Sequence, residues 1–74
     1  MLSYYPMAMT DKGAQFAYYG CDSVEEALKQ FEVWDYEYGF IFKNTWIEVY
    51  DSWQKVKRLS VAKKWVLESV DDIT

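Results

Sequence analysis

The sequence contains no histidine and a single cysteine, Cys21, and these two scarcities narrow the chemistry open to it. Without imidazole there is no histidine general base near neutral pH and no Ser-His or Cys-His nucleophile pair. One thiol can form neither an intrachain disulfide nor a thiolate zinc site. We therefore expect a protein that is not an enzyme and has no metal or cofactor, in a reducing, cytoplasmic setting.

Cys21 itself has two interpretations. It lies just before a predicted helix start, where the positive end of the helix dipole would favour a thiolate. The alternative is a small, partly buried residue that closes a strand. We favour this alternative, because a free cysteine is most often simply buried.

Glycine and long apolar runs are also scarce. Gly13, Gly20 and Gly39 are too far apart to form a glycine-rich phosphate loop. No apolar run approaches the about 20 residues that a membrane-spanning helix needs. Residues 1–9 lack the basic region and the cleavage pattern of a signal peptide. Residues 1–74 are therefore predicted to form one soluble domain with no membrane partner.

Aromatic residues are abundant, since 4 Phe, 4 Trp and 7 Tyr make up 20% of the 74 residues. A domain of this size buries only about 60% of the surface of its unfolded chain, so some rings must stay at the surface. We expect five rings in the core, namely Phe16, Phe31, Trp34, Phe40 and Trp46. The surplus is expected at an interface, where Tyr and Trp are enriched. It comprises Tyr4, Tyr5, Tyr36, Tyr38, Tyr50 and Trp53.

Two segments near the start of the chain predict a β-hairpin. Residues 2–9 are rich in Tyr and Met, and Pro6 suits an edge strand because it cannot donate to a sheet ladder. Residues 10–13 are typical of a turn, and residues 14–20 have the β propensity of a second strand.

The strongest local signal is a capping box that starts at Ser23 and ends at Glu26. In this motif the serine hydroxyl accepts from the backbone N–H of the glutamate, and the carboxylate reaches back to the helix start. Apolar residues then recur at helical spacing and predict one buried face. They are Val24, Ala27, Leu28, Phe31 and Trp34. Gly39 is expected to end the helix.

Residues 40–51 and 55–60 predict a second hairpin with a turn at residues 51–54. If residues 40–51 form one continuous strand, successive side chains alternate between its two faces. One face then holds Ile41, Thr45, Ile47 and Val49, and the other holds Phe40, Phe42, Trp46 and Tyr50. A bulge or turn at Lys43-Asn44 would shift that phase.

Residues 61–70 fit either a short helix capped by Ser60 or a further strand. With the helix as the preferred choice, the pattern is a β-hairpin, one amphipathic helix, a second β-hairpin and a short C-terminal helix. The predicted fold class is therefore a small single-domain α+β protein with an antiparallel sheet.

Charge is unevenly distributed, although the net charge is only −4. Residues 22–51 hold eight acidic and two basic residues, whereas residues 53–65 hold five basic residues and no acidic one. One interpretation is that the basic strand and the acidic helix neutralise each other across the fold. The other is that one of these segments faces a partner.

Our leading hypothesis is a binding protein that engages a protein partner, or a second copy of itself, through an aromatic and acidic surface. In size and charge balance the chain is similar to small acidic phage-encoded inhibitors, including anti-CRISPR proteins. This likeness implies a nucleic-acid mimic that occupies a partner's basic groove. The predicted interface residues are Tyr36, Tyr38, Tyr50, Trp53, Glu25, Glu26, Asp35 and Glu37.

Two alternatives stay open. The basic segment could form a nucleic-acid groove, because lysines meet phosphates and indoles stack on bases. Its residues are Lys55, Lys57, Arg58, Lys63, Lys64 and Trp65. In the other alternative the chain is a structural homodimer with no ligand.

Overall fold

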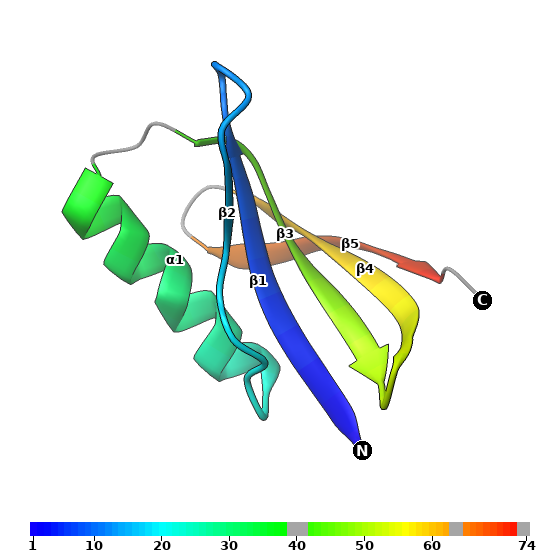
Figure 1. Cartoon of the computed structure of the whole chain (residues 1–74). Coiled ribbons are helices and arrows are strands. Elements are labelled where there is room, and N and C mark those ends of the chain that lie inside the picture. Colours follow the sequence, from blue (N-terminus) through cyan, green and yellow to red (C-terminus); the bar gives the residue numbers. More distant parts are fainter. Residues whose placement is uncertain (39–41, 63–64, 73–74) are drawn as a thin grey trace.

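Five strands and one helix make up the described part of the chain, residues 1–38, 42–62 and 65–72 of a computed structural model (Figure 1). In chain order they are β1 (Leu2–Thr10), β2 (Gln15–Ala17), α1 (Val24–Tyr38), β3 (Phe42–Asp51), β4 (Gln54–Ala62) and β5 (Val66–Asp72). All neighbouring strands are antiparallel, and their order across the sheet is β2-β1-β3-β4-β5. This confirms the predicted class, a small α+β domain with an antiparallel sheet.

The first hairpin closes through the predicted turn. The Thr10 N–H donates to the Ala14 carbonyl (2.8 Å), and the Ala14 N–H donates to Thr10 Oγ1 (3.0 Å). Gly13 has a φ of 89°, in the left-handed region where a side chain would be strained. β2 covers only three of the residues 14–20 that were expected to form it.

Pro6 lies in β1, which has β2 on one side and β3 on the other, so the prediction of an edge strand is wrong. The sheet tolerates this proline because the Pro6 nitrogen, which carries no hydrogen, points away from β3. The Pro6 carbonyl accepts from the Tyr18 N–H (3.2 Å), on the side away from β3. A residue's nitrogen and carbonyl point to the same side of a strand, so the missing donor removes no bond between β1 and β3.

α1 begins where the capping box predicts. The Glu26 N–H donates to Ser23 Oγ (3.2 Å), and Glu26 Oε2 accepts from the Asp22 N–H (2.8 Å), one residue before the donor that the motif usually uses. Both bonds satisfy backbone donors at the start of the helix. In the described residues no helix has the length and apolar character needed to cross a membrane.

Replacing Ser23 by alanine tests this cap. Ser23→Ala removes the acceptor of the Glu26 N–H, so we expect the free energy of unfolding to fall by about 1 kcal/mol. Urea denaturation followed by tryptophan fluorescence measures the loss. Ser23→Asp keeps an acceptor and is the matched control. An equal loss in both variants would contradict a role for the cap.

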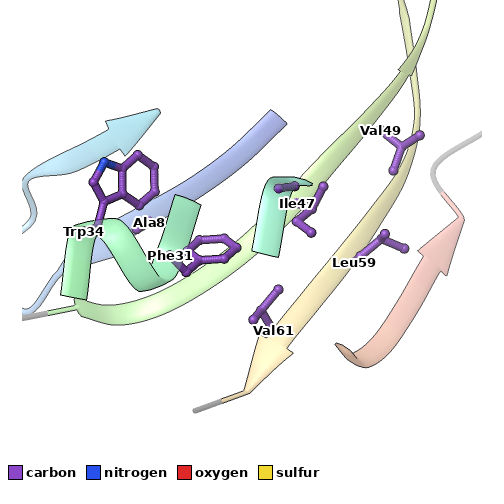
Figure 2. Close-up of a cluster of buried hydrophobic side chains, with 8 residues drawn as sticks. Ala8, Phe31, Trp34, Ile47, Val49, Leu59 and Val61 are labelled. Carbon is purple, nitrogen blue, oxygen red and sulfur yellow. The ribbon is translucent and has the colours of Figure 1, made fainter. Parts of the chain in front are cut away.

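One face of α1 packs against the sheet and forms the core (Figure 2). Ala27, Phe31 and Trp34 are buried, and Val24 and Leu28 are half-buried against the same cluster. All five residues of the predicted helix face are thus confirmed. The sheet supplies the other buried members, which are Ala8 from β1, Ile47 and Val49 from β3, and Leu59 and Val61 from β4.

A β-bulge at Lys43 interrupts the pairing of β3 with β1. It lies within Lys43-Asn44, where the sequence allowed a bulge or turn. The consecutive residues Met9 and Thr10 pair with Asn44 and Phe42, so Lys43 has no partner on β1. The bulge moves the Phe42 ring to the helix side, against rings of β2 and α1. The predicted alternation therefore holds for residues 45–50 and fails for Phe42.

The five rings expected in the core have different outcomes. Phe31 and Trp34 are buried there, and Phe16 is half-buried with its ring edge-on to Trp34 (centroids 5.8 Å apart). Trp46 is buried, but on the face of the sheet opposite α1. Phe40 lies outside the described residues, as do Ile41 and the expected helix end at Gly39.

The last described element, β5, is a strand, whereas the preferred pattern has a short helix there. Of the two alternatives for residues 61–70, the strand is correct, because β4 continues to Ala62 and β5 runs back antiparallel to it. The Trp65 N–H donates to the Ala62 carbonyl (3.0 Å), with Trp65 at a φ of 58°. This turn stacks the Trp65 ring on Phe31 (centroids 5.5 Å apart, 18° between planes). Pairing with β4 and contact with the core together favour the strand.

Candidate binding surfaces

The sheet has a face that α1 does not cover. Direct register partners of an antiparallel sheet share a face, so the pairing of Tyr5 with Glu48 and of Met7 with Trp46 places all four opposite the core. Tyr50 of β3 and two residues of β4, Lys55 and Arg58, add three more side chains to it. We call this the open sheet face, made of Tyr5, Met7, Trp46, Glu48, Tyr50, Lys55 and Arg58.

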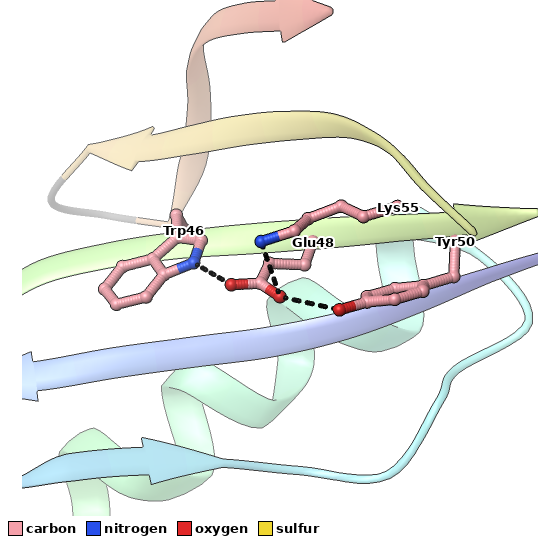
Figure 3. A network of polar contacts seen from close by, with 4 residues as sticks. All are labelled: Trp46, Glu48, Tyr50 and Lys55. Atoms are coloured by element: carbon pink, nitrogen blue, oxygen red, sulfur yellow. Dashed lines mark hydrogen bonds and ion pairs between the residues drawn. The ribbon is translucent and has the colours of Figure 1, made fainter. Parts of the chain in front are cut away.

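Glu48 lies at the centre of a polar network on the open sheet face (Figure 3). Its Oε2 accepts from Trp46 Nε1–H (2.9 Å), and its Oε1 accepts from the Tyr50 hydroxyl (3.3 Å) and lies 3.5 Å from Lys55 Nζ. The Glu48 side chain is 15% exposed, against 39% for Lys55. Three donors therefore compensate a carboxylate that has lost most of its water.

Aromatic contacts extend this network. The Arg58 guanidinium lies 4.6 Å from the centroid of the Trp46 ring, a cation–π contact. The ring of Tyr5 meets that of Tyr50 edge-on, with centroids 5.2 Å apart. A shallow hollow of about 380 Å³ adjoins the network between Tyr5, Tyr50 and Trp53. Both cations of the open sheet face thus have partners within the chain.

The sequence did not predict the Glu48 network, and Glu48 entered there only as one of the eight acidic residues of the segment 22–51. A usable signal was present, because Trp46, Glu48 and Tyr50 occupy alternate positions of one predicted strand. Alternate residues share a face, so a carboxylate between two aromatic hydrogen-bond donors is expected to meet them.

The second candidate surface is the side of α1 that points away from the core. We call it the acidic helix face, made of the exposed residues Glu25, Glu26, Glu32, Tyr36 and Glu37. Lys29 is the only basic residue of α1. The described residues form two ion pairs, Lys55 with Glu48 and the N-terminus with Asp51, and neither involves α1. In this part of the chain, the acidic helix and the basic strand are therefore not neutralised by ion pairs with each other.

Six of the eight predicted interface residues belong to α1. Four lie on the acidic helix face, namely Glu25, Glu26, Tyr36 and Glu37. Asp35 is half-buried, and the ring of Tyr38 meets Phe16 of β2 edge-on, with centroids 5.0 Å apart. Asp35 and Tyr38 are thus partly occupied by contacts within the chain and are less accessible to a partner.

The other two predicted interface residues, Tyr50 and Trp53, lie away from the acidic helix face. Tyr50 belongs to the Glu48 network, and Trp53 is 96% exposed at the tip of the hairpin between β3 and β4. Ser52, just before it, has a φ of 57°, as in the two-residue hairpin turns that need one left-handed residue. The predicted residues therefore form two surfaces instead of one.

The basic segment is divided as well. Lys55 and Arg58 lie on the open sheet face, whereas Lys57 pairs with Val49 and so lies on the helix side. Trp65 is also on the helix side, stacked on Phe31. Lys63 and Lys64 lie outside the described residues. The described part of the segment does not form one continuous groove with Trp65.

Cys21 forms an isolated β-bridge with Tyr4 and is half-buried, as the favoured interpretation expects. Burial raises the pKa of its thiol, and the nearby carboxylates of Glu26 and Asp22 raise it further. These effects oppose the helix dipole, so an activated thiolate is not what this environment produces.

The raised pKa of Cys21 predicts slow alkylation of the native protein. At a pH near the ordinary cysteine pKa of about 8.5, iodoacetamide is expected to react more slowly with the folded chain than with the same chain in urea. The native rate should continue to rise at pH values where the rate of the unfolded chain has levelled off. Mass spectrometry of timed samples measures both rates. A native rate equal to or above the unfolded one would contradict the raised pKa.

Comparison with protein families, with curated proteins and with solved structures gives no match to this chain. Among residues 1–38, 42–62 and 65–72, no group of three His, Cys, Asp or Glu side chains is placed to hold a metal ion. A function must therefore be inferred from the two surfaces.

Proposed function

We propose that this protein binds a basic surface of another protein through the acidic helix face. A difference in charge compensation supports this. On the open sheet face, Lys55 contacts Glu48 and Arg58 lies over Trp46, so both cations have partners within the chain. The described residues give the exposed carboxylates of α1 no ion pair. The charge that has no partner within the described residues is therefore mainly negative and lies on α1, where it can attract a basic partner.

The acidic helix face suits a groove lined by lysine and arginine. Glu25 and Glu32 are seven residues apart, so they recur after two helical turns, about 10 Å along the axis. Tyr36 follows one turn later and is 92% exposed. Carboxylates steer and orient the encounter, and an exposed tyrosine supplies apolar contact area. The specific form of the proposal is a cytoplasmic inhibitor that occupies a groove which otherwise holds nucleic acid.

Charge-neutral variants test the proposal. Glu25→Gln/Glu32→Gln keeps the shape of the acidic helix face, and Asp11→Asn/Asp51→Asn removes the same charge from exposed positions outside α1. Immobilised wild type and variants are compared for retention of proteins from a nuclease-treated cell extract, quantified by mass spectrometry. We expect the α1 variant to reduce retention of basic partners roughly tenfold and the control variant to leave it nearly unchanged.

The same experiment can contradict the proposal. If both variants reduce retention equally, net charge accounts for the binding and the acidic helix face does not. Retention that survives high salt undiminished would also count against it, because attraction between exposed charges is screened over about 10 Å at 0.1 M salt.

Single-stranded nucleic acid is a second candidate ligand, favoured by the position of two cations beside aromatic rings. Lys55 and Arg58 share the open sheet face with Tyr5 and Tyr50, and the hollow there reaches Trp53. Stacking of a base on Trp53 would quench its fluorescence, with an affinity that falls steeply as salt rises. No quenching by an oligonucleotide at low salt would exclude this candidate.

A further inference from the structure

The hollow beside the Glu48 network is lined by aromatic rings and by one charged group. Glu48 is the only lining residue that carries a charge at neutral pH, and three of the others are aromatic. The lining consists of Tyr5, Met7, Ala17, Glu48, Tyr50, Ser52 and Trp53. A concave surface with three rings and one carboxylate favours a ligand that is apolar in shape and positively charged.

The rings of Tyr5 and Tyr50 form two walls of this hollow at a steep angle. Their planes are 74° apart, and their centroids are separated by 5.2 Å. Trp53, at the tip of the hairpin between β3 and β4, supplies a third ring and is 96% exposed. In the described chain the only cation–π contact is that of Arg58 with Trp46. The three rings of the hollow are therefore available to a cation from outside the chain.

The Glu48 carboxylate strengthens the attraction of this hollow for a cation. It accepts from the Tyr50 hydroxyl (3.3 Å), and a hydrogen bond to an anion increases the electron density of the phenol ring (Figure 3). Lys55 Nζ lies 3.5 Å from the same carboxylate, but Lys55 does not line the hollow. Its side chain is 39% exposed, so it compensates the negative charge only in part.

We propose that this hollow binds a quaternary ammonium group, such as the trimethylammonium group of choline. The contacts of Glu48 favour this class over a primary ammonium. Its oxygens already accept from Trp46 and Tyr50 and lie beside Lys55, so a ligand N–H would have to displace one of these donors. A trimethylammonium group presents its positive charge on methyl groups and needs no acceptor, so it can contact the rings directly.

Titration with choline chloride, followed by NMR of nitrogen-15-labelled protein, tests the proposal. The Trp53 indole N–H and the amides of Tyr5 and Tyr50 are expected to shift, while those of α1 stay in place. The neutral analogue in which carbon replaces the choline nitrogen has the same shape without the charge. We expect it to bind roughly fivefold more weakly. Binding of this analogue as tightly as choline would overturn the proposal, because the hollow would then select for apolar shape alone.

Variants locate the site. Tyr5→Leu removes a wall outside the polar network and is expected to weaken choline binding roughly fivefold. Trp53→Ala should do the same without affecting the fold, because this residue is exposed, whereas Trp53→Phe keeps a ring and most of the affinity. Tyr36→Leu, at a 92% exposed position of α1, is the matched control and should bind like the wild type. Lys55→Gln should tighten binding, since it removes a competing cation. Equal affinity in all these variants would contradict the assignment.

Two further ligands separate the sources of such a group and the other candidate ligand. Choline binding without retention of the protein by phosphatidylcholine vesicles assigns a free compound, and retention by these vesicles assigns a lipid headgroup. Shifts of Trp53 with a single-stranded oligonucleotide but not with choline would overturn the proposal in favour of nucleic acid. The acidic helix face lies on the other side of the sheet, so either result leaves binding of a basic protein to be decided separately.

Discussion

Phe31→Ala is expected to remove most of the free energy of unfolding and to leave a large unfolded fraction at room temperature. Phe31 is fully buried, edge-on to Trp34 (centroids 5.7 Å apart) and stacked on Trp65, so its ring joins α1 to the turn before β5. Truncating a buried phenylalanine costs about 3–5 kcal/mol, from lost burial and from the cavity that stays behind. The whole stability of a domain this small is about 5 kcal/mol. This single substitution can therefore remove nearly all of the free energy of unfolding.

Urea denaturation followed by near-ultraviolet circular dichroism measures this effect, since both ring partners of Phe31 are tryptophans. Phe31→Leu fills most of the space and should cost clearly less than Phe31→Ala, although it too loses the ring contacts with Trp34 and Trp65. Val33→Ala lies two residues away on the exposed side of α1 and should change stability by less than about 0.5 kcal/mol. A cooperative transition in Phe31→Ala at the urea concentration of the wild type would show that α1 is not held by this ring.

The elements predicted correctly are those that depend on neighbours in sequence. The cap at Ser23 and the buried stripe that ends at Trp34 involve residues three or four positions apart, and both are present. Phe42 was placed on the wrong face because its position depends on a bulge against β1, more than thirty residues earlier in the chain. The preferred helix within residues 61–70 was wrong for a similar reason, since pairing with β4 selects the strand.

The candidate surfaces were also predicted only where they depend on neighbours in sequence. Acidic and aromatic residues were expected to form one interface, because residues 25–53 contain most of them. Which face a residue occupies depends on which side of the sheet α1 packs against, and this packing places Glu25 and Tyr50 on opposite sides of the sheet. The Glu48 network could have been predicted from the sequence, because Trp46, Glu48 and Tyr50 are alternate residues of one strand and alternate residues share a face.

Removing the Glu48 carboxylate is expected to destabilise the protein more than loss of a surface acid would. In Glu48→Leu, the Trp46 indole N–H loses its acceptor while its ring stays only 7% exposed. An unsatisfied buried donor costs about 1–3 kcal/mol. The Tyr50 hydroxyl and the Lys55 ammonium lose the same acceptor, but Lys55 is exposed enough to recover water, so most of the loss is assigned to Trp46.

Glu48→Gln separates the hydrogen bond from the charge. Its amide oxygen can still accept from Trp46, whereas the ion pair with Lys55 is lost. Because the Lys55 side chain is 39% exposed and can recover water, we expect the loss of this pair to cost about 1 kcal/mol. We therefore expect Glu48→Leu to be clearly less stable than Glu48→Gln in urea denaturation. The emission maximum of Trp46 should shift in Glu48→Leu alone, which a single-tryptophan version of the chain would isolate. If the two variants are equally stable, the network serves to orient Trp46 and Tyr50 on the open sheet face without stabilising the fold.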